Sequence, residues 1–209
     1  RYFCLAGIGL PFIALPCFAL DIRFEGAESA PVENATALRA FAADIQHALP
    51  PRAAEFIDRP VVITFKELGG ERELGEVCPS GDKTKKPPIL GQELTVRWAQ
   101  DRYDIQLHRG LLKEIAKGAA GSREIGCLHG TMYKTALATT LHELGHIIDS
   151  SHRFSGSKKY QSLTDWSSGL LGPSSKNTLT TRSPNDYEFK NPAENFAVNF
   201  EYFLLDPEF

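Results

Sequence analysis

The spacing of apolar residues along the chain predicts three amphipathic helices. Apolar side chains recur every three or four residues across residues 36–49, across 131–150 and from residue 191 onward, which places them on one face of an α-helix. The first segment stops at Pro50-Pro51, and the last opens at Asn191-Pro192, where proline suits the first helical turn. We therefore expect each helix to turn one face toward a common core.

A different pattern predicts strands ahead of the two later helices. Residues 61–65 are compact and β-branched, and residues 94–98 and 103–107 alternate between apolar and polar. A short helix is expected over residues 111–117. The remaining stretches are predicted to be an extended lead-in over 21–35 and loops over 78–91, 118–130 and 153–186. Segregated strands and helices indicate an α+β fold with a small mixed sheet.

The first nineteen residues have the pattern of a signal peptide. Arg1 precedes a run from Tyr2 to Leu20 without a charged side chain, and Ala19 is small, as a signal peptidase prefers. Two prolines and two glycines make this run a poor membrane-spanning helix, although an anchor is the alternative interpretation. We expect a leader over 1–19, an exported protein without stable membrane insertion, and a single domain over 20–209.

Cysteine use agrees with export. Cys4 and Cys17 lie in the leader, which leaves Cys78 and Cys127 in the mature part. An even pair in an exported protein suggests one disulfide, with two free buried thiols as the alternative. Neither has a neighbour at CxxC spacing, so a zinc–cysteine site is not expected.

Composition limits the partners. The 209 residues are 42% hydrophobic and 23% charged, which is ordinary for a globular domain and unlike a disordered chain. The formal net charge of -3 gives no basic excess, so no nucleic-acid partner is expected.

The segment His142-Glu143-Leu144-Gly145-His146 carries the most specific chemistry in the chain. Histidines four residues apart on a helix lie one turn apart on the same face, where both imidazoles can hold one zinc ion. Glu143 can then act as general base on a water molecule. Gly145 allows another element to pack closely against the helix. The competing interpretation is a pair of structural histidines.

A catalytic zinc needs a third protein ligand, and the residues offer three candidates: Asp149, His152 and Glu194. His152 has the spacing of the metzincin pattern, but Asp149 replaces its glycine and the only methionine, Met132, lies upstream of the histidines. Glu194 belongs to the last helix, as in gluzincins. Tyr187 lies seven residues before Glu194, and its hydroxyl near a zinc ion could stabilise an oxyanion.

Two segments resemble one family of zinc peptidases. Residues 142–149 read H-E-x-x-H-x-x-D, residues 187–194 read Y-x(6)-E, and residues 201–207 continue the likeness. Together they resemble the gluzincin metallopeptidases related to anthrax lethal factor and Mlc titration factor A. The resemblance implies a zincin-like fold in which the sheet packs on the active-site helix and a C-terminal helix supplies the third ligand.

The resemblance also implies a role for each site residue. These are Zn²⁺ held by His142, His146 and Glu194, Glu143 as base, Tyr187 as oxyanion helper, and Asp149 as a carboxylate that orients a ligand histidine. In zincins an edge strand before the active-site helix binds extended peptide, and residues 103–108 are the candidate by position. An ordinary sheet strand is the equal alternative.

The function expected from these residues is that of a zinc-dependent metallopeptidase acting on a peptide or protein substrate. Two alternatives stay open. One is a zincin-like domain that binds a partner without turnover, which the presence of Glu143 disfavours. The other is a zinc hydrolase of a non-peptide amide, such as cell-wall material, which the sequence does not separate from a peptidase.

Overall fold

A computed structural model describes residues 20–25, 32–66, 97–98, 101–124, 130–164, 166 and 187–206. Within these ranges the strands form one four-stranded sheet, in the order β1-β2-β4-β3. Its strands are β1 (Ile22–Glu25), β2 (Val61–Lys66), β3 (Arg97–Trp98) and β4 (Tyr103–His108). The three longer strands are parallel and β3 runs antiparallel at one end, so the sheet is mixed, as predicted.

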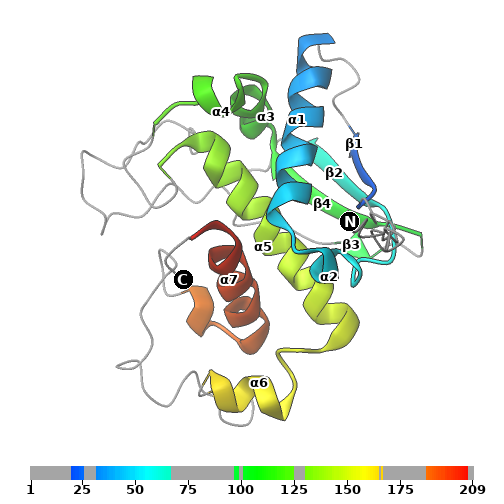
Figure 1. Ribbon diagram of the computed structural model, residues 1–209, viewed down its shortest axis with the longest axis vertical. Coiled ribbons are helices and arrows are strands. Elements are labelled where there is room, and N and C mark those ends of the chain that lie inside the picture. The colour runs from blue at the N-terminus through cyan, green and yellow to red at the C-terminus, as the bar shows by residue number, and fades with distance from the viewer. Residues whose placement is uncertain are drawn as a thin grey trace, which may run out of the picture.

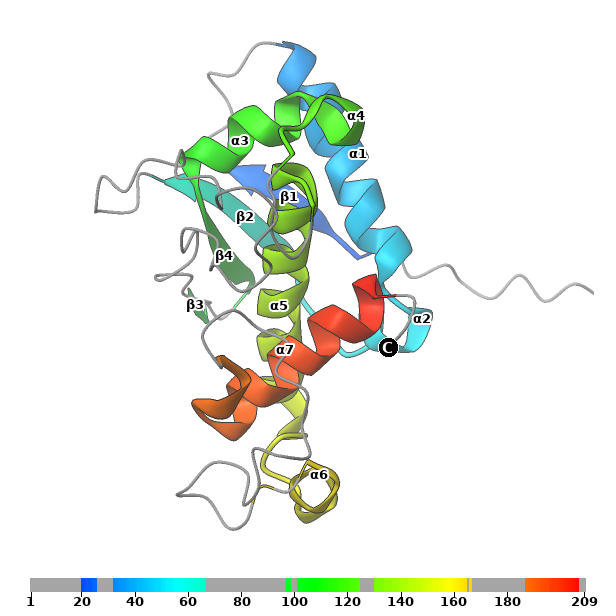
Figure 2. The ribbon, with the colours of Figure 1, turned by 90° about the vertical axis from the view of Figure 1, so that its left-hand side faces the viewer.

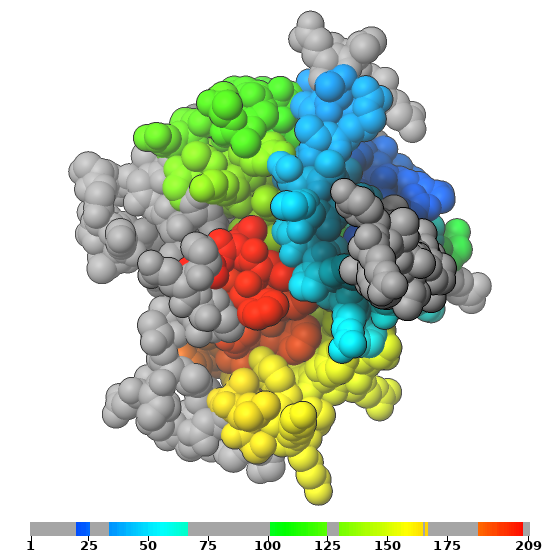
Figure 3. All heavy atoms as spheres, in the orientation of Figure 1, coloured from blue at the N-terminus to red at the C-terminus, as the bar shows by residue number. Residues whose placement is uncertain are grey.

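Helices make up most of the described chain. They are α1 (Val32–Ala48), α2 (Pro51–Ala54), α3 (Arg109–Ala116), α4 (Gly118–Gly121), α5 (Met132–His152), α6 (Lys158–Leu163), the 3₁₀ helix η1 (Tyr187–Phe189) and α7 (Pro192–Leu205). Helices α1 and α5 lie on one side of the sheet, and α7 crosses α5 (Figures 1 and 2). Helix α7 reaches the surface between α1 and α6 (Figure 3).

The core lies between the sheet and these helices. Val61, Ile63 and Phe65 of β2 pair in register with Tyr103, Ile105 and Leu107 of β4, and all six side chains are buried in one cluster. Alternate residues of a strand share a face, so this set defines the face that the helices cover. Helix α5 contributes Leu141, Leu144 and Ile148 to the same cluster. The apolar pattern that predicts α5 is therefore its core-facing side.

Local side-chain bonds fix both ends of α5. The Thr131 hydroxyl accepts a hydrogen bond from the Lys134 amide, which makes Thr131 the N-cap. Arg153 ends the helix in the left-handed conformation, with φ of 54°. Both carboxylate oxygens of Asp149 then accept hydrogen bonds from Ser155, one from its amide and one from its hydroxyl, each at 2.6 Å.

The main elements confirm the sequence predictions, and four short ones, β1, α2, α4 and α6, correct them. The helix predicted over 36–49 begins earlier, at Val32, and part of the predicted extended lead-in is strand β1. The predicted loops after α3 and α5 contain α4 and α6. These helices are too short to show a periodic apolar face, and α6 depends on Ser157 as its N-cap.

Strand β4 lies between β2 and β3, and β3 pairs with its first two residues, Tyr103 and Asp104. Of the two interpretations of residues 103–108, an edge strand or an ordinary sheet strand, this order favours the second. The position of a strand in a sheet depends on pairing with distant segments, here β2 and β3, which the pattern of β4 itself does not contain. The leader at 1–19, residues 94–96 of a predicted strand, and Cys78 and Cys127 lie outside the described residues. Among the described helices, none is long and apolar enough to cross a membrane.

Candidate metal centre

Two histidines stand one turn apart on α5. The ring centroids of His142 and His146 are 4.8 Å apart and the rings are nearly perpendicular, at 82°. Their side chains are only partly exposed, with 12% and 20% of the surface accessible. This is the arrangement that the i, i+4 spacing predicts on one helix face.

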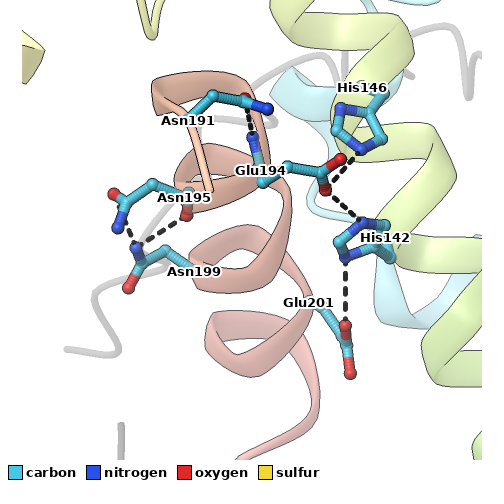
Figure 4. A network of polar contacts seen from close by, with 7 residues as sticks. All are labelled: His142, His146, Asn191, Glu194, Asn195, Asn199 and Glu201. Carbon is cyan, nitrogen blue, oxygen red and sulfur yellow. Dashed lines mark hydrogen bonds and ion pairs between the residues drawn. The ribbon is translucent and has the colours of Figure 1, made fainter. Parts of the chain in front are cut away.

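Helix α7 brings a carboxylate to the two imidazoles. The Asn191 side chain caps the helix by accepting from the Glu194 amide at 2.9 Å, and Pro192 occupies the first turn. Glu194 therefore stands at a fixed place in the first turn. Its Oε2 lies 3.3 Å from Nε2 of His142 and 3.2 Å from Nε2 of His146 (Figure 4).

The three side chains fit a divalent metal such as zinc. Each offers one donor atom, and the three atoms lie within 4.8 Å of one another. In a tetrahedral zinc site with bonds of about 2.0–2.1 Å, donor atoms stand roughly 3.3 Å apart. The two distances from Glu194 match that spacing, and His₂Glu is a known catalytic zinc set. Within the described ranges, no other cluster of this kind occurs.

A glycine sets how closely the two helices approach. A Cβ added at Gly145 would lie 3.1 Å from Cα of Ala197 and 3.2 Å from Cδ1 of Phe200. Both distances are shorter than ordinary van der Waals contact, so a side chain at this position would push α7 away. This confirms the expectation that Gly145 permits close packing of another element.

We expect Gly145→Ala to lower the free energy of unfolding by about 1–3 kcal/mol, the usual cost of overpacking. Alanine has the higher helix propensity by about 1 kcal/mol, but the added methyl meets the backbone of α7, which cannot turn aside. Urea unfolding measures the change. Gly121→Ala is the control, because its added Cβ would meet only a side-chain carbon of Lys117 at 3.4 Å. Equal stability of Gly145→Ala and the parent would contradict this account.

Comparison with known proteins places the chain in a family. Residues 90–166 and 162–209 match a family described as a domain of unknown function, DUF7844. The chain belongs to this family. No curated protein and no solved structure matches it. The two matched segments contain both α5 and α7, so the DUF7844 match spans the candidate site.

The site of this DUF7844 chain holds a carboxylate with an unusual pKa. Glu143 has 4% of its surface exposed. Burial raises the pKa of Glu143 to about 7, with His142 and His146 acting in the opposite direction and Glu194 and Glu201 adding to the rise. A carboxylate near neutrality can both accept and return a proton at physiological pH.

Glu194 and His142 form a charged pair at the centre of the DUF7844 site. Burial alone would raise the pKa of Glu194, but its hydrogen bonds with the two histidines outweigh burial and hold that pKa at about 2. Burial alone would lower the pKa of His142, but hydrogen bonds with Glu194 and Glu201 raise it to about 10. A metal ion that binds His142 must therefore displace a proton.

Glu201 is the site residue that reasoning from the sequence did not single out. It lies on α7, seven residues after Glu194, and is buried. Its Oε2 is 3.3 Å from Nδ1 of His142, on the side of the ring opposite Glu194 (Figure 4). Two carboxylates two turns apart on one helix were the available signal.

The other candidate residues contact residues other than the two histidines or have side chains outside the described residues. Both carboxylate oxygens of Asp149 contact Ser155, so the structure gives this side chain a role at the end of α5 rather than at a histidine ring. His152 is exposed and its ring packs on Phe56 and Phe154, at centroid distances of 4.4 and 5.5 Å. Tyr187 begins η1, and its side chain lies outside the described residues.

Proposed function

We propose that the protein is a zinc-dependent metallopeptidase whose ion is held by His142, His146 and Glu194. The observation that carries the proposal is the position of Glu194 Oε2, at 3.3 and 3.2 Å from the two imidazole nitrogens. Residues 52 positions apart in sequence meet with the spacing of zinc donors. The nature of the three donors and the open fourth position of such a set support a catalytic ion.

Zinc bound at this set would polarise the substrate carbonyl and make a water molecule more acidic. The carboxylate of Glu143 takes a proton from that water while the oxygen of the water bonds to the carbonyl carbon. Glu143 then returns the proton to the leaving nitrogen as the C–N bond breaks, so one water is consumed for each amide cleaved. Its burial and its pKa of about 7 suit both steps.

By its resemblance to gluzincin peptidases, Tyr187 would donate its hydroxyl proton as a hydrogen bond to the developing oxyanion. The backbone of η1 and that of α7 lie in contact, which places Tyr187 on an element attached to the ligand-bearing helix. Export through the leader at 1–19 is part of the same proposal, with a peptide or protein as substrate.

The buried position of Glu143 favours turnover over the alternative of a binding domain. A site that only holds a metal has no need of an additional buried carboxylate, and among the described residues no lysine or arginine forms an ion pair with Glu143. The cost of burying this carboxylate is visible in its raised pKa. Hydrolysis of a non-peptide amide would use the same residues, so only an experiment with both kinds of substrate distinguishes it from peptide cleavage.

Zinc dependence of hydrolysis tests the proposal. The zinc-loaded protein is incubated with a mixed peptide library, and new amino termini are identified by mass spectrometry. We expect cleavage that 1,10-phenanthroline stops and added Zn²⁺ restores. Cleavage of amide-linked cell-wall fragments alone would favour the second hydrolase. A fully loaded protein that cleaves neither class would overturn an enzymatic function.

A further inference from the structure

Glu201 is a buried carboxylate directed at one ligand histidine. Its residue is 8% exposed, and Oε2 lies 3.3 Å from Nδ1 of His142. The other ring nitrogen, Nε2, lies 3.3 Å from Glu194. The imidazole of His142 is thus held between two carboxylates of α7 (Figure 4).

The contact determines which nitrogen of His142 is free to bind a metal. Without a metal both ring nitrogens of His142 face a carboxylate, and a metal ion replaces the hydrogen on only one of them. Glu201 lies outside the group of three donors and can accept the hydrogen that stays on Nδ1. The lone pair of the neutral ring then lies on Nε2, the atom next to Glu194 and His146. A carboxylate behind an imidazole also increases the electron density that the ring gives to a metal.

The second histidine lacks this support. His146 reaches Glu194 through Nε2, and in the described part of the chain no carboxylate lies at its Nδ1. The two histidines are therefore unequal ligands, although their places in the sequence motif look equivalent. Glu201 is on the same helix as Glu194, with about 10 Å of helical rise between them, so one rigid element supplies both carboxylates.

We propose that Glu201 is a positioning residue that makes His142 the anchoring ligand of the metal site. It acts through His142 by fixing the ring orientation and the tautomer, and it touches neither metal nor substrate. The proposal rests on the metal site of the proposed function but is independent of peptide cleavage.

Zinc affinity measured by competition with a chromophoric chelator tests this role. Glu201→Gln keeps the size of the side chain and removes its charge, and we expect zinc to bind about 10–100-fold more weakly. Asp149→Asn is the matched control, since it removes a buried carboxylate of α5 that contacts Ser155. We expect its zinc affinity to stay within about threefold of the parent. Thermal unfolding of each metal-free variant confirms folding, and Glu201→Ala, which also removes the carboxylate, replaces Glu201→Gln if the latter does not fold.

A double-mutant cycle separates positioning from a general structural effect. In a His142→Ala background, Glu201→Gln should change zinc affinity by less than about threefold, because its partner ring is gone. In a His146→Ala background it should still weaken binding about tenfold or more. Equal losses in both backgrounds, or parental affinity of Glu201→Gln itself, would overturn the proposal.

The same measurements distinguish a protein that does not bind zinc from one that binds zinc but is not an enzyme. A parent protein that binds no zinc overturns both proposals. A parent that binds zinc and cleaves no amide overturns only the peptidase, while the affinities of the Glu201 variants still decide the positioning role.

Discussion

Glu143→Gln is expected to abolish hydrolysis while zinc remains bound. Glutamine has nearly the same shape but cannot take the proton of the attacking water. Loss of a general base lowers kcat by roughly 10²–10⁴-fold. Glu143 does not belong to the group of candidate ligands, so the metal content should not change. The measurement is kcat on a peptide found in the library experiment, together with bound zinc by atomic absorption.

Asp149→Asn serves as the control for this substitution as well. It also neutralises a buried carboxylate of α5, but one whose two oxygens are occupied by Ser155. We expect it to affect stability more than kcat. If Glu143→Gln cleaved peptides as fast as the parent, the assignment of Glu143 as base would be wrong.

The second large effect concerns the third ligand. Glu194→Ala is expected to weaken zinc binding by at least about 100-fold. This is more than the loss expected when a residue that only hydrogen-bonds to a ligand is removed, because Glu194 is itself a proposed ligand. His152→Ala should leave zinc affinity unchanged, because its ring packs against Phe56 and Phe154 at the far end of α5. Chelator competition on both variants gives the comparison directly.

The pair of variants separates two arrangements of the site. If His152→Ala lost zinc and Glu194→Ala kept it, the third ligand would be the histidine of the metzincin pattern. The free energy of unfolding provides the internal check. His152→Ala removes aromatic packing and should lower it, so a folded variant with normal zinc affinity assigns His152 a structural role.

The half of the site on α5 could be predicted from sequence because helix geometry is local. The apolar repeat of Leu141, Leu144 and Ile148 predicts the helix, and a known helix fixes the relation of His142 to His146. The close approach at Gly145 also follows from a local cause, since only a missing side chain leaves room for another backbone.

The other half depends on how α7 crosses α5, which no local pattern determines. From the residues alone Asp149, His152 and Glu194 are all candidates for the third ligand, and only tertiary packing brings one of them, Glu194, within 3.3 Å of the imidazoles. For the same reason the sequence alone does not reveal the contact of Glu201 with His142, or that Asp149 contacts Ser155 and not a histidine. The partner of a carboxylate on one helix is known only when the position of the facing helix is known.

The division of the ligands between two helices has a consequence for folding. An ion held by His142, His146 and Glu194 would join α5 and α7 across the intervening chain, and only the folded protein presents the three donors together. Binding of that kind acts by mass action, and each tenfold rise of free zinc above the dissociation constant adds about 1.4 kcal/mol to the stability of the native state. The temperature at which this protein unfolds would then report the zinc supply of its surroundings.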